Sequence, residues 1–192
     1  ALSSRVTFNS IAQLERYRTR APASRLGLRI NPGYSDVATD LYNPCTPGSR
    51  LGVGPDRLAG GLPDGVSGLH VHNLCESGPE ALAATINHLE ARFGHLLDAI
   101  DWLNLGGGHL LTRADYDHTV AVAALNALQE RHPRLTLLLE PGAAFAWQAG
   151  VLVATVLDIV DTGGVPVAVL DTSFAAHMPD CLEMPYTPTV RG

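Results

Sequence analysis

Short apolar runs and helix-like segments alternate along the chain up to residue 142. Residues 10–18, the stretch that Pro79 opens and residues 114–131 carry apolar side chains at helical spacing, with Asn9 or Ser10 as the expected cap of the first helix. The strand-like runs are residues 5–8, 26–30, 66–72, 102–105 and 135–140. This alternation gives five βα-type repeats of roughly 30 residues, which is the pattern of a parallel sheet or barrel.

The pattern changes after Gly142. Residues 150–161 and 165–171 are rich in valine and are joined by Thr162-Gly163-Gly164, which is typical of an antiparallel hairpin. We therefore expect an α/β chain with a partial parallel (β/α)8 barrel over residues 1–148 and the beginning of an antiparallel β domain over residues 149–192. Five strands cannot close a barrel that needs eight.

Composition excludes several classes of protein. A net charge of −6 argues against a nucleic-acid surface, and a hydrophobic fraction of 46% is ordinary for a globular core. Cys45, Cys75 and Cys181 are far apart and odd in number, so we expect no disulfide framework and a reducing, cytoplasmic setting. The sequence shows no signal segment and no apolar run of the ~18 residues that a membrane span needs. Because the first residue is not Met, we expect a piece of a longer protein.

Candidate chemistry gathers where the apolar runs end. Gly106-Gly107-Gly108 lies between a strand and a helix, where backbone N–H groups can converge on an anion, although such turns are also common without a ligand. Glu140 follows a leucine-rich strand, so it is either a site carboxylate at the sheet edge or a helix-capping residue.

Two histidines on one strand leave two interpretations open. His70 and His72 are two residues apart, so both point to the same face. An HxH pair on a barrel strand is a zinc-ligand spacing, for which His109, Asp171 and His177 are possible further ligands. The alternative is a structural pair with satisfied hydrogen bonds.

Charged residues at two other places indicate a site or a scaffold. Arg29 is expected on the interior face of its strand, where it either borders a ligand or forms a salt bridge. The loop after the second β run holds an acidic group that is either a solvated turn or a set of partners for the cationic groups of a ligand. Its members are Asp171, His177, Asp180 and Glu183.

Five motifs occur in the order of one enzyme family. They are RLGLRINPGYSDVATDLYNPCTPGSRLGV, SGLHVHN, LNLGGGH, LLLEPG and LDTSFAAHMPDCLEMPY. Together they run nearly end to end and resemble the carboxynorspermidine/carboxyspermidine decarboxylases. These are pyridoxal-phosphate enzymes with an alanine-racemase-like barrel, related to the ornithine and diaminopimelate decarboxylases. The resemblance implies a homodimer that binds a small polyamine precursor in spermidine biosynthesis, with this chain covering barrel strands four to eight and the start of the β domain.

The resemblance also implies the roles of individual residues. Glu140 would meet the pyridine nitrogen of pyridoxal 5'-phosphate and His72 would stack on its ring, which makes these two the catalytic residues. Asp171 is the first choice for the substrate end of the pocket, ahead of the other members of its group. The remaining cofactor-binding residues are Arg29 beside the ring, Cys75 near the phosphate, and Gly106, Gly107 and Gly108 around the phosphate.

The chain departs from the family pattern in two places. All 13 of its basic residues are arginine, whereas the family holds its cofactor through a lysine. Ala143 follows the EPG motif where relatives often have Arg or Glu. We therefore expect an internal fragment that is inactive by itself, with the lysine encoded upstream.

Rival functions remain open at this stage. They are a diaminopimelate- or ornithine-type decarboxylase, a metal-dependent barrel hydrolase that uses His70 and His72, and a non-catalytic cofactor-binding module. Tyr42, Asn43, Cys45 and Arg50 belong to the loop that marks the resemblance, and the sequence assigns them no individual roles.

Overall fold

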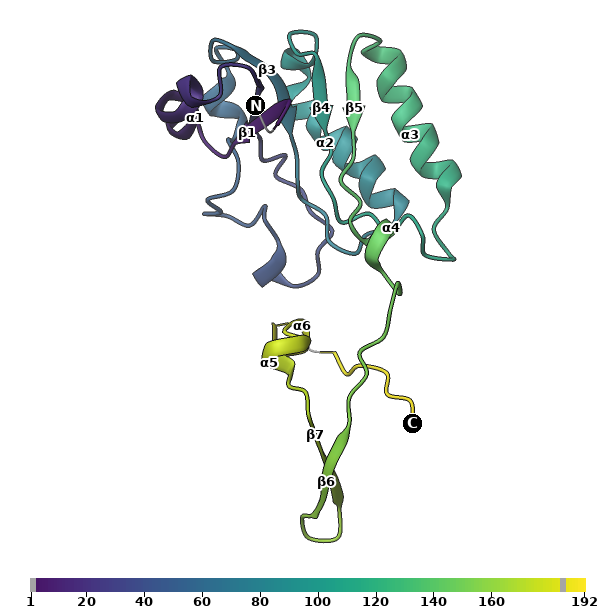
Figure 1. Ribbon diagram of the computed structural model, residues 1–192. Coiled ribbons are helices and arrows are strands. Elements are labelled where there is room, and N and C mark those ends of the chain that lie inside the picture. The colour runs from purple at the N-terminus through teal and green to yellow at the C-terminus, as the bar shows by residue number, and fades with distance from the viewer. Residues whose placement is uncertain (1–2, 184–185) are drawn as a thin grey trace. The chain divides into compact units, whose positions relative to one another are not determined.

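A computed structural model describes residues 3–183 and 186–192 (Figure 1). The chain divides into two compact units, Ala1–Trp147 and Gln148–Gly192, which we describe separately. The first unit contains a five-stranded parallel sheet with helices, and the second contains an antiparallel hairpin with short helices. This confirms the predicted α/β class.

The sheet of the first unit has the strand order β1-β2-β3-β4-β5, and each strand is parallel to its neighbours. Sequential order is expected where each helix returns the chain to the same end of the sheet. The strands are β1 (Arg5–Phe8), β2 (Arg25–Arg29), β3 (Val66–His70), β4 (Trp102–Asn104) and β5 (Thr136–Leu138).

Main-chain pairing continues past these strand ends. The amide of Val71 donates to Asn104 (2.8 Å), that of Leu105 donates to Leu138 (2.9 Å), and that of Glu140 donates to Gly106 (2.7 Å). These bonds hold the loops at the carboxyl edge of the sheet in register with one another, so the residues just beyond each strand have fixed positions.

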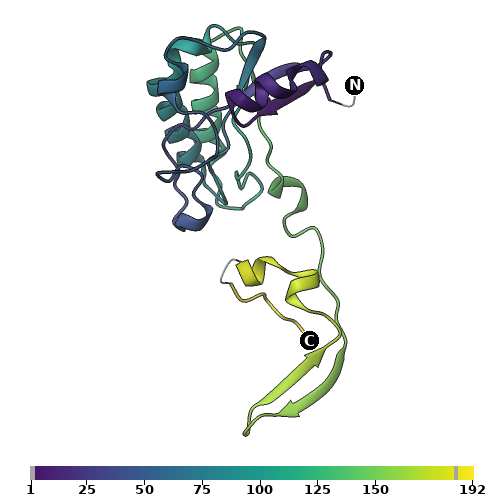
Figure 2. The same ribbon diagram turned by 90° about the vertical axis from the view of Figure 1, so that its left-hand side faces the viewer.

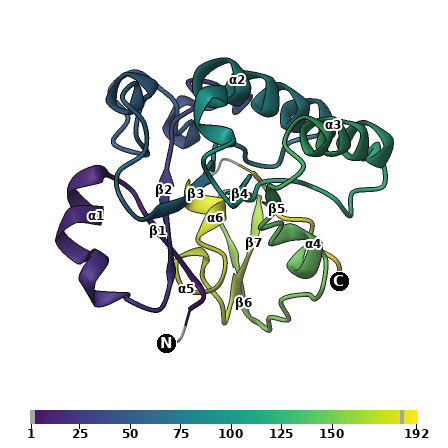
Figure 3. The same ribbon diagram turned by 90° about the horizontal axis from the view of Figure 1, so that it is seen from above.

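α-Helices follow β1, β3, β4 and β5, whereas β2 is followed only by short 3-10 turns. Figure 3 shows α2 and α3 side by side on one face of the sheet. The main helices are α1 (Ile11–Tyr17), α2 (Pro79–Leu97), α3 (His118–Arg131) and α4 (Ala143–Ala146). Short 3-10 turns occupy Arg18–Arg20, Asp40–Tyr42 and Pro55–Leu58.

Several predicted boundaries were wrong, including those of one helix and one strand of the first unit. The helix expected over residues 114–131 begins at His118, because the Asp117 carboxylate caps it by accepting from the amide of Thr119. The run at 135–140 forms a ladder only over Thr136–Leu138. Of the two expected caps of the first helix, Ser10 is the one used.

The core lies between the sheet and its helices. Leu28, Leu69 and Leu103 are fully buried on the helix-facing side of adjacent strands, and α2 covers them with an apolar stripe. Each such side chain contributes roughly 1.5–3 kcal/mol by leaving water. The buried stripe of α2 includes Leu82, Ile86, Leu89, Phe93, Leu96 and Leu97.

The opposite side of the sheet is filled by one large ring. The Trp102 side chain is 1% exposed and lies across Gly27 and Gly68 of the two neighbouring strands. A Cβ at Gly68 would lie 2.0 Å from Trp102 Cε2, so neither strand has room for a side chain there. Because side chains alternate along a strand, Arg29, His70 and Asn104 project from this same side.

Replacing Gly68 by alanine should therefore destabilise the fold by about 1–3 kcal/mol, because the Trp102 ring is displaced from a closely packed site. The control is Gly94→Ala in α2, where an added Cβ meets nothing within 4 Å. That change should stabilise by up to about 1 kcal/mol. Urea unfolding measures both, and equal effects of the two variants would contradict the packing described here.

The second unit is built around a hairpin (Figure 2). Strands β6 (Val156–Asp161) and β7 (Pro166–Leu170) pair antiparallel, as predicted, although β6 begins six residues later than expected from the valine-rich run at 150. Gly163 and Gly164 have positive φ, and the Asp161 carboxylate accepts from the amide of Gly164 (2.7 Å). Two short helices follow, α5 (Phe174–His177) and α6 (Asp180–Glu183). Among the described residues, no helix has both the length and the apolar character needed to span a bilayer.

Candidate functional site

Four neighbouring strands bring the predicted first-unit residues to one edge of the sheet. Arg29 ends β2, His72 follows β3, the glycine turn follows β4 and Glu140 follows β5. Because all four strands run parallel, their carboxyl ends meet at this edge, where ligands of α/β proteins commonly bind. The side chains of His70, His72 and Glu140 converge there.

The Glu140 carboxylate is the centre of this group. Its Oε1 accepts a hydrogen bond from Asn104 Nδ2 at 2.8 Å. Its Oε2 lies 3.5 Å from His70 Nε2 and 4.0 Å from His72 Nδ1. About half of the Glu140 side chain (51%) remains exposed, so the carboxylate is held on one side and open on the other. The structure therefore shows Glu140 as a carboxylate at the sheet edge and not as the cap of a helix.

The two histidines are held in different surroundings. The His70 side chain is 15% exposed and that of His72 is 45% exposed. Burial lowers the pKa of both rings, and the Arg29 guanidinium lowers each of them further, while Glu140 opposes these effects. Both imidazoles are therefore neutral near pH 7, and the His72 side chain is the more exposed of the two.

Arg29 fixes the chain beside His72. Its guanidinium donates to the backbone oxygen of His72 at 2.8 Å, which is not the salt bridge that was one sequence-based alternative. The other alternative, a contact with a ligand, stays a prediction. Burial lowers the pKa of Arg29, and the nearby Cys45 opposes that effect. Arginine nevertheless stays charged at physiological pH, so a positive charge borders the site.

The glycine turn packs against two other loops. A Cβ at Gly107 would lie 2.6 Å from the backbone oxygen of Glu140, and one at Gly108 would lie 2.1 Å from that of Leu74. Gly106 and Gly108 also have positive φ. The amide of Gly106 donates to Asn104 Oδ1 (2.9 Å), and that of Gly107 points at His72 Nδ1 (3.4 Å). The amide of Gly107 is therefore held less closely than that of Gly106.

Cys75 lies on the loop beside this turn. It is exposed, and its backbone nitrogen is 2.8 Å from the position that a Cβ on Gly108 would take. Burial of the sulfur raises the pKa of the Cys75 thiol, and Glu76 and Asp36 raise it further, so the thiol is neutral at pH 7. The next hydroxyl, Ser77 Oγ, donates to Asp36 Oδ1 (2.7 Å).

Asn104 is a site residue that sequence reasoning did not single out. The LNLGGGH motif could have indicated this residue. A side-chain amide that ends an apolar strand directly before a glycine turn has few possible hydrogen-bond partners. His109, at the other end of the same motif, is completely buried. It is not part of the cluster of possible metal ligands, which contains His70, His72 and Glu140.

The proposed substrate residues all lie in the second unit. Asp171 Oδ1 accepts from the amide of Thr155 (2.7 Å), and this bond lowers the pKa of Asp171. His177 Nδ1 accepts from the amide of Ser173 (3.3 Å) and adds a smaller lowering of the Asp171 pKa. Asp180 and Glu183 are the first and last residues of α6. Their roles toward a substrate remain predictions.

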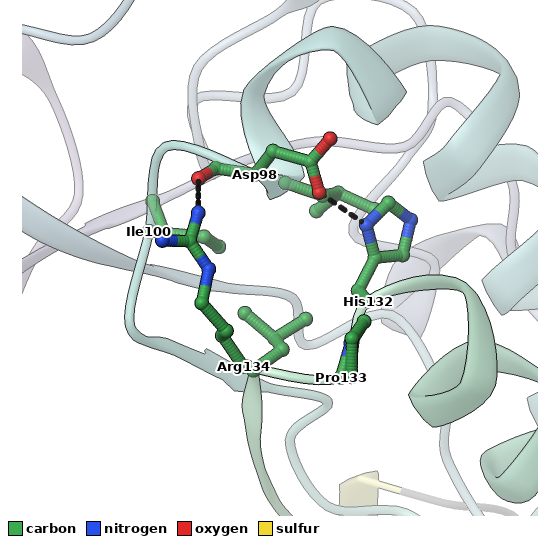
Figure 4. A pocket seen from close by; sticks show the side chains of 7 residues that line it. Asp98, Ile100, His132, Pro133 and Arg134 are labelled. Carbon is green, nitrogen blue, oxygen red and sulfur yellow. Dashed lines mark hydrogen bonds and ion pairs between the residues drawn. The ribbon is translucent and has the colours of Figure 1, made fainter.

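A small pocket lies at the opposite edge of the sheet, beside the amino ends of β4 and β5 (Figure 4). There His132 Nδ1 and Asp98 Oδ1 are 2.9 Å apart, and the Arg134 guanidinium donates to the backbone oxygen of Asp98 at 3.1 Å. These contacts join the end of α2 to the segment between α3 and β5. The lining residues are Leu97, Asp98, Ile100, His132, Pro133, Arg134 and Leu135.

Solved structures of several decarboxylases share this architecture. An arginine decarboxylase of Paramecium bursaria Chlorella virus bound to agmatine superposes with a TM-score of 0.73 over 97% of this chain and 52% of its own length. At 20% identity, this likeness shows the fold alone. The carboxynorspermidine decarboxylase of Campylobacter jejuni, complexed with norspermidine, superposes with a TM-score of 0.84 at 36% identity, over 97% of this chain and 47% of that one.

Sequence identities to curated proteins define the relatives of this chain more closely. A carboxyaminopropylagmatine decarboxylase of Synechocystis is 55% identical over 100% of this chain and 50% of its own length. A carboxynorspermidine/carboxyspermidine decarboxylase of Campylobacter jejuni is 38% identical over 99% of this chain and 49% of its own. No family model matches the chain. The chain is thus a homologue of these decarboxylases, as its motifs predicted, and it spans about half the length of the curated relatives it matches.

The buried imidazole of His109 gives a prediction about pH. Burial lowers the pKa of His109 in the folded protein, so its contribution to stability is present above the unfolded-state pKa of about 6.5 and is lost as the pH falls below it. His109→Leu removes this titration. The variant should lose less stability than the wild type between about pH 7 and pH 5.

Urea unfolding at the two pH values measures the difference. The control is His118→Leu, because His118 is exposed on the first turn of α3. If the two leucine variants show the same pH dependence as the wild type, His109 does not titrate on unfolding as described.

Proposed function

We propose that the protein containing this chain is a pyridoxal-phosphate-dependent decarboxylase of carboxynorspermidine or carboxyspermidine in polyamine biosynthesis. The observation that carries the proposal is the meeting of Glu140, His72 and the glycine turn at one sheet edge, in a chain with 36% identity to a norspermidine-complexed decarboxylase. A homodimer in the cytoplasm, with a barrel completed by other parts of the longer protein, belongs to the same proposal.

The residues present fit the cofactor. A carboxylate with one open side, an accessible neutral imidazole and a glycine turn lie within one group, and Glu140 and the turn are joined through backbone and side-chain bonds. When bound, pyridoxal phosphate supplies a conjugated ring that accepts the electron pair left behind by the departing carboxylate. A carboxylate partner keeps a proton on the ring nitrogen and so makes the ring a better electron acceptor.

Each residue of the site has a part in this proposal. Glu140 would hold the proton at the ring nitrogen, and His72 would cover one ring face. Arg29 would keep the His72 backbone in place through its 2.8 Å bond. The turn Gly106–Gly108 would bind the phosphate, with Cys75 beside it. The lysine that holds the cofactor covalently in such enzymes would come from a part of the protein outside this chain, which has none.

The substrate would carry several positive charges. Asp171, Asp180 and Glu183 provide carboxylates that could receive ammonium groups. A second substrate, carboxyaminopropylagmatine, is favoured by one observation, namely the 55% identity to the Synechocystis enzyme named for it. Rates of CO₂ release from the three carboxylated amines, measured with the full-length protein, decide between them.

The two rival functions, a diaminopimelate-type decarboxylase and a metal-dependent hydrolase, receive different support. Diaminopimelate decarboxylases share the fold at about 20% identity, which is no argument for their substrate. A metal-dependent hydrolase is favoured by the cluster of His70, His72 and Glu140, whose ligand atoms lie within 4.8 Å of one another. Elemental analysis of the purified full-length protein tests it, because a hydrolase of this kind retains stoichiometric zinc.

Glu140→Gln in the full-length protein should lower the rate of decarboxylation on the order of 100-fold, because an uncharged amide does not hold a proton on the ring nitrogen. Steady-state CO₂ release measures the effect. The matched control is Glu130→Gln on the exposed side of α3, which should stay within about twofold of the wild type. A Glu140→Gln enzyme as active as that control would refute the assigned role.

The 192-residue chain alone should form no stable covalent link between a side chain and pyridoxal phosphate, because it contains no lysine. Borohydride reduction followed by mass spectrometry of proteolytic peptides measures this, because it separates a side-chain adduct from one on the terminal α-amino group. The full-length protein, treated in the same way, is the positive control. A stoichiometric adduct on a side chain of the short form would disprove the expectation.

A further inference from the structure

Asn104 connects two parts of the candidate site that lie on different strands. Its Oδ1 accepts from the amide of Gly106 at 2.9 Å, and its Nδ2 donates to Glu140 Oε1 at 2.8 Å. We propose that Asn104 is the positioning residue of the site: it sets the direction of the Glu140 carboxylate and ties it to the glycine turn. This inference rests on the proposed function, because it concerns how Glu140 meets the cofactor.

Within residues 3–183 and 186–192, the Glu140 carboxylate has no other hydrogen bond as short as the one from Asn104. Its distances to the ring nitrogens of His70 and His72 are 3.5 and 4.0 Å, beyond a good hydrogen bond. Half of the Glu140 side chain is exposed, and it stands beyond the last ladder residue of β5. Without the amide of Asn104, the carboxylate could adopt several rotamers.

The backbone decides which way the Asn104 amide faces. The N–H of Gly106 can only donate, so it requires the side-chain oxygen of Asn104 on its own side. The amino group must then face Glu140, where it donates to an acceptor-only carboxylate. The amide therefore occupies the single orientation that satisfies both partners.

The backbone at Asn104 and Gly106 is also held in place. The backbone oxygen of Asn104 accepts from the amide of Val71 at 2.8 Å, and Gly106 is fixed in the left-handed region with φ +71°. Two positions earlier on the same strand face, the Trp102 side chain is completely packed. Asn104 is therefore a rigid support for a side chain that is exposed.

This support selects one oxygen of the carboxylate for the ligand. Because Oε1 is bound by Asn104, Oε2 is the oxygen left on the side of His70 and His72. His72 is the exposed ring assigned to the cofactor face, so Oε2 is placed to meet a ring nitrogen beside it. An aspartate at 104 would keep the acceptor for Gly106 but would set a second carboxylate against Glu140.

The Asn104→Asp exchange therefore separates the two bonds in the full-length protein. The experiment measures the dissociation constant of pyridoxal phosphate by absorbance titration, together with the rate of CO₂ release and the thermal midpoint of the cofactor-free protein. We expect Asn104→Asp to weaken cofactor binding and to slow CO₂ release, each on the order of tenfold. The thermal midpoint should be nearly unchanged, since the bond to Gly106 is retained.

Asn9→Asp is the matched control. Asn9 also bridges two partners, since its Oδ1 accepts from the amide of Gly52 (3.0 Å) and its Nδ2 donates to the backbone oxygen of Arg50 (2.9 Å). No carboxylate takes part in that bridge. The control variant should bind pyridoxal phosphate within about twofold of the wild type.

A double-variant cycle shows whether Asn104 acts through Glu140. In a Glu140→Gln background, Asn104→Asp should change cofactor affinity by less than about twofold, because the repelling partner is gone. Full loss in that background, or wild-type affinity of the single Asn104→Asp variant, would overturn the inference. A wild-type protein that neither binds pyridoxal phosphate nor releases CO₂ would instead refute the proposed function itself.

Discussion

The turn after β4 must pass so close to its neighbours that only glycine fits. A Cβ at Gly106 would lie 2.4 Å from the backbone oxygen of Val71, and one at Gly107 would lie 2.6 Å from that of Glu140. These approaches bring the ends of β3, β4 and β5 together. The relative placement of His72 and Glu140 depends on this constraint, because both follow strands whose loops press against the turn.

Electrostatics then assigns different tasks to the assembled groups. Burial keeps the imidazoles of His70 and His72 neutral, so the nearby positive charge is that of Arg29 and the negative charge is that of Glu140. A neutral imidazole can stack on a flat aromatic ligand whose ring nitrogen is protonated, because the imidazole carries no charge that would repel that nitrogen. The carboxylate, held by Asn104 on one oxygen, leaves the other oxygen available. The arrangement suits a ligand with a protonated aromatic nitrogen at one end and an anionic group at the other.

Much of the first unit could be predicted from the sequence, because its core residues repeat with the periods of strands and helices. The five strands and the position of Glu140 at the sheet edge followed from that pattern. The start of α3 did not, because the Asp117 cap sets it and the apolar spacing alone placed it at residue 114. Asn104 escaped notice because its partner Glu140 is 36 residues away, a contact that no local pattern encodes.

A crystal structure of the full-length protein with bound pyridoxal phosphate would test the central claim most directly. We expect Glu140 Oε2 within hydrogen-bond distance of the pyridine nitrogen, at about 2.7–3.0 Å. The phosphate should lie on the turn of Gly106, Gly107 and Gly108. A cofactor bound away from this sheet edge, or one whose pyridine nitrogen faces a group other than Glu140, would contradict the account.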